Sequence, residues 1–266
     1  MKKLVIFGVP RSGTSWLGEI INASEITCYR YQPLFSYAHK ACLNSCSTEQ
    51  DIDNFFARLI SCQDSFTCQS RERESAIKPI FQKEECKFVG FKEVRYLDLL
   101  IPLLRNHPSL KVIALIRNPF EVLDSWISAP REFRFDLGWN PEEEWRYAFK
   151  KNINRPENFF GFEKWKEFYL LVKAAKNLYP SRLHVIDYWN LKTEIISEVK
   201  KIYDFLQIPI SPQVLKFCEE STQLTNTHAY SVYKNSPKDQ SYQSVILSQE
   251  INNQIRSELS EIGYKF

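Results

Sequence analysis

The sequence lacks several features that would place it in a common class. It has no uninterrupted apolar run long enough to cross a membrane, and its net charge of +3 over 266 residues is far from that of a nucleic-acid-binding surface. The apolar run at the N-terminus stops at Pro10 without a small-residue cleavage site after it, so we expect a buried strand rather than a signal peptide. These absences favour a cytoplasmic protein whose partner is neither a membrane nor a nucleic acid.

Cysteine is present, but not at metal-binding spacing. The seven cysteines include no CxxC pair, and the nearest spacings are Cys42 to Cys46 and Cys62 to Cys68. Zinc sites favour tighter pairs with partner histidines, so no metal is expected. The cysteines are better explained as small buried apolar side chains in a reducing compartment.

Strand and helix patterns alternate along the chain. Short apolar runs predict strands at 2–8, 87–91, 111–116 and 182–187. Helical spacing predicts helices at 14–23, 96–106, 162–179 and 192–207. Asn118 and Pro119 are suited to begin a further helix after the third strand. This order predicts an α/β fold in a single domain over residues 1–266, with a parallel sheet covered by helices on both faces.

Two weakly patterned segments, 37–85 and 129–160, interrupt this order. In an open α/β sheet, such insertions usually lie over the carboxyl ends of the strands, where ligands bind. We therefore expect them to contribute to a ligand pocket, with plain connecting structure as the alternative.

Glycine is scarce, with seven residues in the chain, yet two of them lie in the stretch FGVPRSGTSW, residues 7–16. A loop between a strand and a helix offers converging backbone N–H groups and the positive end of the helix dipole, which suit a phosphate or sulfate group. A nucleotide phosphate loop carries lysine directly after its second glycine, whereas this chain has Thr14 there and Arg11 inside the turn. The missing lysine and the missing acidic partner for Mg²⁺ indicate a less charged group, such as a sulfuryl group. A plain strand-to-helix turn is the alternative.

A second anion site is indicated by LIRNPFEVLDSW, residues 115–126. Arg117 ends the clearest buried strand, and Ser125 follows eight residues later, two turns into the next helix. A cation at a strand end and a hydroxyl on the following helix can hold an anion between them. Arg117 could instead form a surface ion pair, but so apolar a strand has little reason to end in arginine for solubility alone.

The two motifs, in this order, resemble those of the sulfotransferases that use 3′-phosphoadenylyl sulfate (PAPS), and the surrounding sequence is most similar to the carbohydrate branch. PRSGTSWL resembles the loop that binds the 5′-phosphosulfate, RNPFEVLDS resembles the 3′-phosphate motif, and VIDYWNL is similar to a segment whose tyrosine lies near the adenine. The resemblance implies a three-layer, P-loop-like fold and metal-independent, in-line transfer of a sulfuryl group, with adenosine 3′,5′-bisphosphate (PAP) as product. The donor-binding residues that it implies are Arg11, Ser12, Gly13, Thr14, Ser15, Trp16, Arg117, Ser125 and Tyr188.

The resemblance also implies catalytic residues, and the chain departs from the family in two places. Lys92, at the end of the second predicted strand, matches a family lysine near the transferring group, and Arg11 would share its role in stabilising charge. The usual C-terminal Arg-Lys-Gly signature is absent, and Lys234 is the substitute we consider. Gln32 stands where the carbohydrate branch commonly has a glutamate, so it can orient an acceptor but cannot take its proton.

Another group must then act as the base, or the acceptor must need none. Glu93 directly follows Lys92, although strand alternation could turn it away from the donor. His39 has a suitable ordinary pKa, although it could be a solvated loop residue. An acceptor with an amine or guanidine-like nitrogen would need a weaker base than an acceptor with a sugar hydroxyl.

Two other functions stay open at this point. A catalytically inactive PAPS- or nucleotide-binding module is supported by Gln32, whereas a P-loop small-molecule kinase would need the missing lysine. The acceptor of a sulfotransferase would be a carbohydrate or another small molecule, bound by segments 37–85 and 129–160. The sequence specifies neither that acceptor nor the oligomeric state.

Overall fold

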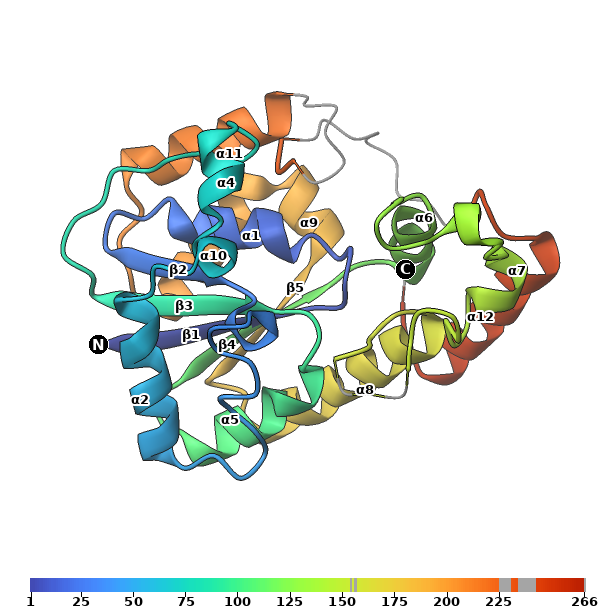
Figure 1. Ribbon diagram of the computed structural model, residues 1–266, viewed down its shortest axis with the longest axis horizontal. Coiled ribbons are helices and arrows are strands. Elements are labelled where there is room, and N and C mark those ends of the chain that lie inside the picture. Colours follow the sequence, from blue (N-terminus) through green and yellow to red (C-terminus); the bar gives the residue numbers. More distant parts are fainter. Residues whose placement is uncertain (154, 156, 225–230, 234–242, 266) are drawn as a thin grey trace.

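A five-stranded parallel sheet forms the centre of the molecule (Figure 1). The computed structural model describes residues 1–153, 155, 157–224, 231–233 and 243–265, so Lys234 lies outside the described residues. The order of the strands across the sheet is β2 (Thr27–Tyr31), β3 (Phe88–Glu93), β1 (Lys2–Phe7), β4 (Lys111–Ile116) and β5 (Leu183–Asp187).

Helices connect the strands and extend the chain beyond them. The α-helices of the described residues are α1 (Thr14–Asn22), α2 (Glu49–Ile60), α3 (Ser65–Cys68), α4 (Ser70–Glu74), α5 (Leu100–Asn106), α6 (Pro119–Ile127), α7 (Pro141–Glu144), α8 (Phe162–Leu178), α9 (Tyr188–Thr193), α10 (Ile195–Leu206), α11 (Pro212–Gln223) and α12 (Gln249–Glu261). The 3₁₀ helices are η1 (Pro33–Phe35), η2 (Leu97–Leu99) and η3 (Phe135–Leu137).

The sheet is apolar on both faces because side chains alternate along each strand. In β1, Val5 and Phe7 belong to a core shared with α2, α5, α6, α8 and α12. Leu4 and Ile6 belong to a second core shared with α1, α10 and α11. Figure 1 shows α2, α5 and α8 on one side of the sheet and α1 and α11 on the other, which confirms the predicted parallel sheet with helices on both faces.

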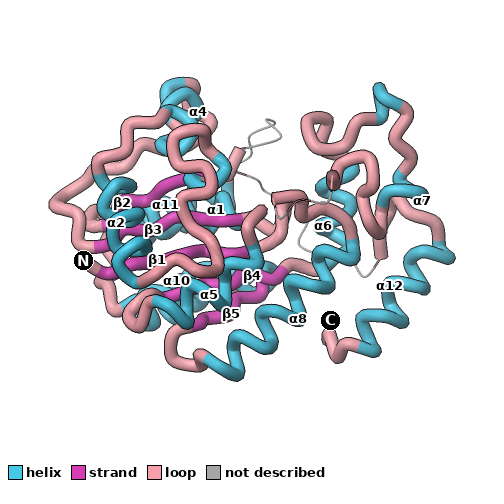
Figure 2. Tube along the Cα trace, turned by 60° about the horizontal axis from the view of Figure 1, so that its bottom comes forward, coloured by secondary structure: helices cyan, strands magenta, loops and turns pink. Residues whose placement is uncertain are grey.

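The carboxyl ends of the strands point towards a part of the molecule built by α6, α7 and α12. Figures 1 and 2 both show these helices beyond the strands, on the side away from the N-terminus. The predicted start of α6 is confirmed, because the side chain of Asn118 accepts a hydrogen bond from the backbone N–H of Phe120 and Pro119 occupies the first turn.

Two predicted details were wrong. The sequence pattern did not predict β2, a strand at the edge of the sheet. The helix expected over 192–207 is present as α10 but starts later, at Ile195, because residues 188–193 form the separate helix α9, which Asp187 caps and which a break at Glu194 separates from α10. The seven cysteines are all free, and Cys218 alone among them is fully buried.

Candidate active site

A pocket of about 770 Å³ lies at the carboxyl edge of the sheet. Its wall takes residues from the end of every strand or from the loop that follows it, which is where parallel sheets bind ligands. The predicted site residues in this wall are Arg11, Gly13, Thr14, Ser15, Trp16, Gln32, Lys92, Arg117, Ser125 and Tyr188. Ser12, His39 and Glu93 are described but are not part of the wall.

The first loop leaves the N-terminus of α1 open towards this pocket. Gly13 precedes the helix with a φ of 94°, and no side chain caps the N–H groups of the first turn. A Cβ on Gly13 would come within 2.6 Å of the ring of Tyr188, so both the backbone conformation and the space require glycine. Uncapped N–H groups at a helix N-terminus form an anion site.

Arg11 adds a cation to the loop at some cost in backbone strain. Its φ of 71° lies in the left-handed region, which costs a non-glycine residue roughly 1–2 kcal/mol. This backbone conformation places the Arg11 side chain in the pocket wall, where its Nε donates to Ser125 Oγ at 3.1 Å. The loop and the second motif are therefore in direct contact.

Arg117 connects the two motifs from the other side. Its Nη1 donates to the backbone oxygen of Arg11 at 3.0 Å, and its Nε donates to Glu121 at 2.8 Å. The ion pair that we considered as an alternative role for Arg117 is thus present, with Glu121 one helical turn further on. These bonds use two of the five guanidinium N–H donors. The ion pair therefore orients Arg117 and leaves other N–H groups that can donate to a ligand.

Tyr188 forms an aromatic wall next to both motifs. The guanidinium of Arg117 lies 4.4 Å from the centre of its ring. Trp16 packs edge-on against the ring, with 6.1 Å between the ring centres. The indole N–H of Trp16 is held by Ser221 Oγ at 2.9 Å, which fixes its position. The arrangement offers an aromatic surface beside the Arg117 cation.

Lys92 brings a buried ammonium group to the same pocket. Its Nζ donates to Ser15 Oγ at 2.6 Å and lies 4.2 Å from the centre of the Tyr31 ring. Burial, followed by the charge of nearby Lys78, holds the pKa of Lys92 well below its ordinary value. An anion in the pocket would stabilise the charged form of Lys92.

Glu93 and His39, the two candidate bases, both lie outside the pocket wall. Glu93 Oε1 accepts backbone N–H bonds from Val94 at 2.9 Å and Arg95 at 2.8 Å, so this carboxylate holds the turn after β3. Burial raises its pKa. His39 Nε2 lies 3.2 Å from Cys62 Sγ, and burial lowers the pKa of this histidine. The alternation of β3 that points Lys92 into the pocket points Glu93 away from it.

The pocket also contains residues that we did not predict. Tyr31 at the end of β2 is one of them, and it lines the pocket beside the predicted residue Gln32, which is buried. Other unpredicted wall residues are Phe66, Gln69, Arg71, Glu72, Lys78, Arg95, Arg131, Glu132, Phe160 and Lys192. Several come from segments 37–85 and 129–160, whose sequences carry no periodic signal. Both segments therefore contribute to the pocket.

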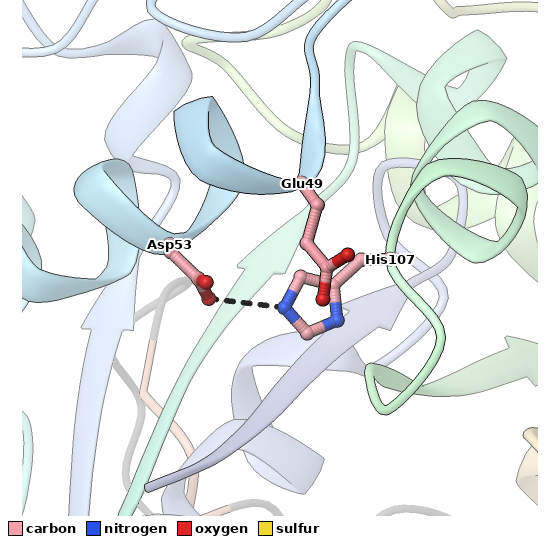
Figure 3. A group of neighbouring side chains, drawn as sticks. All are labelled: Glu49, Asp53 and His107. Atoms are coloured by element: carbon pink, nitrogen blue, oxygen red, sulfur yellow. Dashed lines mark hydrogen bonds and ion pairs between the residues drawn. The ribbon is translucent and has the colours of Figure 1, made fainter.

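A separate group of possible metal ligands lies at the amino end of the sheet. Figure 3 shows Glu49, Asp53 and His107, whose ligand atoms all lie within 4.8 Å of one another. Asp53 already forms an ion pair with Lys3 at 2.6 Å, and its Oδ1 lies 3.0 Å from His107 Nε2. A cation therefore already neutralises this carboxylate, and the group is not part of the pocket wall.

The fold and the pocket define an α/β protein with a P-loop-like anion site that a second, cationic strand end completes. The family model described as "Sulfotransferase domain" matches residues 1–261, so the chain belongs to the sulfotransferase domain family. The predicted enzyme class is thereby confirmed, and membership decides against the kinase alternative. No curated protein matches the sequence significantly.

Solved structures of sulfotransferases share the fold. The sulfotransferase domain from the curacin biosynthetic pathway is 18% identical, with 97% of this chain and 96% of that chain covered and a TM-score of 0.51. The sulfotransferase domain of the Synechococcus PCC 7002 olefin synthase is 13% identical, with 97% and 94% covered and a TM-score of 0.50. Retinol dehydratase, solved with androsterone and inactive cofactor PAP, is 12% identical, with 97% and 80% covered and a TM-score of 0.52. The predicted fold class is confirmed. Within the described residues, no helix is both long and apolar enough to span a membrane.

Proposed function

We propose that this protein transfers a sulfuryl group from PAPS to a hydroxyl or nitrogen of a small-molecule or carbohydrate acceptor. The observation that carries the proposal is the joining of two anion motifs across one pocket, with Arg11 bonded to Ser125 and Arg117 bonded to the Arg11 carbonyl. A ligand that fills this pocket must present two separate anionic groups. The retinol dehydratase that shares the fold is described with PAP, the product form of such a donor.

The residues present fit this donor. The open N-terminus of α1, with Arg11 and Ser15 beside it, would hold the 5′-phosphosulfate. Arg117 and Ser125 would hold the 3′-phosphate, and the ring of Tyr188 would pack against the adenine. Ser12 would contribute to the loop through its backbone, because its side chain is buried and does not reach the wall. The positive charge of these groups suits a polyanion without a metal counter-ion.

PAPS supplies the chemistry of a sulfuryl group on a good leaving group: the acceptor forms a bond to sulfur while the bond from sulfur to the 5′-phosphate oxygen breaks. Arg11 and Lys92 would stabilise the charge that develops on that oxygen, together with the loop N–H groups. Lys92 is already held by Ser15, so little reorganisation is needed. A base takes the acceptor proton, and PAP and the sulfated acceptor leave.

We propose that Glu132 is this base rather than Glu93 or His39. Glu132 lies in the pocket wall, in segment 129–160, and forms an ion pair with Lys151 at 3.0 Å that holds its carboxylate in place. Its charge also acts on Tyr31, the residue over which Lys92 lies, so it is close to the transferring group. Segments 37–85 and 129–160 would build the acceptor side around Tyr31, Gln32 and Phe160.

The proposal is tested by comparing ligands and then acceptors. Calorimetry should show binding of PAPS and PAP, and no comparable binding of ATP with Mg²⁺. An acceptor screen with PAPS should then release PAP in step with a sulfated product detected by mass spectrometry. Binding of PAPS without turnover on phenols, amines or sugars would favour the inactive binding module. Equal binding of ATP would refute the assignment of the pocket.

A further inference from the structure

Lys78 is a buried cation in the pocket that the donor assignment above does not use. It follows α4 in segment 37–85, its side chain is only 4% exposed, and it lies in the pocket wall. Its Nζ makes no hydrogen bond to any of the described residues. A buried ammonium group without hydrogen bonds is costly unless a ligand completes it.

Glu19, the carboxylate with which Lys78 forms an ion pair, already accepts hydrogen bonds from other side chains. Glu19 of α1 is fully buried, accepts a hydrogen bond from Arg73 Nη2 at 3.0 Å and accepts another from Asn22 at 2.9 Å. Lys78 Nζ lies 3.6 Å from Glu19, beyond hydrogen-bond length. Arg73 and Lys78 therefore share the negative charge of Glu19, and the charge of Glu72 also acts on Lys78. Burial lowers the pKa of Lys78, as expected for an ammonium whose charge is incompletely matched.

Lys78 and Lys92 meet at one aromatic ring. Lys78 Nζ lies 4.4 Å from the centre of the Tyr31 ring, and Lys92 Nζ lies 4.2 Å from it. Lys92 in turn donates to Ser15 of the first loop. Successive contacts thus connect Ser15 of the loop to Lys92, Lys92 to the Tyr31 ring, and that ring to Lys78.

The charges around this row call for an anion. Lys92 is acted on by the positive charges of Lys78, Arg11 and Arg95, against the negative charge of Glu93. Buried like charges at this density are destabilising unless a counter-ion neutralises them. Arg11 and Lys92 were assigned to the transferring group, and Lys78 brings a second ammonium group to the Tyr31 ring beside Lys92.

We propose that Lys78 binds the sulfuryl oxygens of the donor, so that the transferred group sits between two buried ammonium groups supplied by β3 and by segment 37–85. This inference rests on the proposed function, since it requires PAPS as the donor. It assigns to segment 37–85 a part in recognising the donor's reactive end, in addition to any contact with the acceptor.

Lys78→Met tests the inference, because methionine keeps the apolar stem and removes the charge. Calorimetry without acceptor would measure the dissociation constants for PAPS and for PAP, which lacks the sulfuryl group. We expect the affinity for PAPS to fall by about tenfold or more and the affinity for PAP to change by less than about twofold. Lys78→Arg, which keeps the charge, should retain a preference for PAPS and covers the case in which Lys78→Met fails to fold.

Arg73→Met is the matched control. Arg73 shares Glu19 with Lys78 but is not part of the pocket wall, so its loss should not select against PAPS. An equal loss of PAPS and PAP affinity in Lys78→Met would overturn the inference, as would the same PAPS-selective loss in Arg73→Met. Wild-type protein that binds neither nucleotide would instead refute the proposed function, which distinguishes the two failures.

Discussion

Replacing Arg117 with alanine should abolish recognition of the 3′-phosphate. Two guanidinium N–H donors hold the Arg11 carbonyl and Glu121, which leaves others to donate to a phosphate. A charge-assisted hydrogen bond of this kind contributes about 1.5–3 kcal/mol, which corresponds to about 10–150-fold in affinity. The truncation also removes support for Arg11 and a partner of Glu121, and these losses affect every nucleotide alike. The ratio of the affinities for two nucleotides, one with the 3′-phosphate and one without it, therefore isolates the phosphate contact.

The assay is calorimetry with PAP and with adenosine 5′-monophosphate, which lacks the 3′-phosphate. Wild type should prefer PAP, and Arg117→Ala should lose about 10–150-fold of that preference, in addition to any loss of affinity that both nucleotides share. Glu121→Gln is the control, because it weakens the ion pair yet keeps Arg117, and it should retain most of the preference. An unchanged ratio in Arg117→Ala would show that the 3′-phosphate binds elsewhere.

Three further predictions follow from the loop and the pocket wall. Arg11→Ala should lower kcat far more than it weakens PAPS binding, since its charge acts most on the leaving oxygen, and Arg11→Lys should restore part of the rate; equal losses would make it a binding residue only. Gly13→Ala should lower the Tm and abolish PAP binding, because a non-glycine residue in the left-handed conformation costs roughly 1–2 kcal/mol, and the new Cβ would also clash with the Tyr188 ring. A normal Tm and affinity would contradict this account. Glu132→Gln should reduce kcat by about 100-fold or more with PAP affinity nearly unchanged, whereas His39→Ala and Glu93→Gln should keep most of the rate of the folded protein; the reverse pattern would return the base to the residues expected from sequence.

The elements that sequence predicted well are those whose signal is local. The strand at 111–116 matches β4 residue for residue, because a central strand buried on both faces must be continuously apolar. β2 lies at the sheet edge and contains Arg30, whose side chain reaches out to the carbonyl oxygens of Leu59 and Ile60. That strand needs only half of its side chains to be apolar, so its sequence resembles a loop.

The same division holds for the site. The loop and the second motif each occupy a short stretch, so their residues could be named from spacing and resemblance, and seven of those residues lie in the pocket wall. Lys78 and Glu132 could not be found in this way. Each reaches the pocket through tertiary contacts, Lys78 through Glu19 of α1 and Glu132 beside Lys151, and neither segment shows the periodicity that would place it. Glu93 failed to reach the pocket wall because a strand directs consecutive side chains to opposite sides.

The crossed hydrogen bonds between Arg11, Ser125 and Arg117 have a consequence for protein engineering. Each motif supplies a donor to the other, so neither can be exchanged with that of a relative as an independent cassette. A graft of the first loop that places lysine at position 11 would lose the bond from Nε to Ser125 and would keep only the bond from Arg117 to the backbone carbonyl of residue 11. Substitutions in the two motifs should therefore be epistatic, and chimaeras within this family should keep or replace residues 8–16 and 117–125 together.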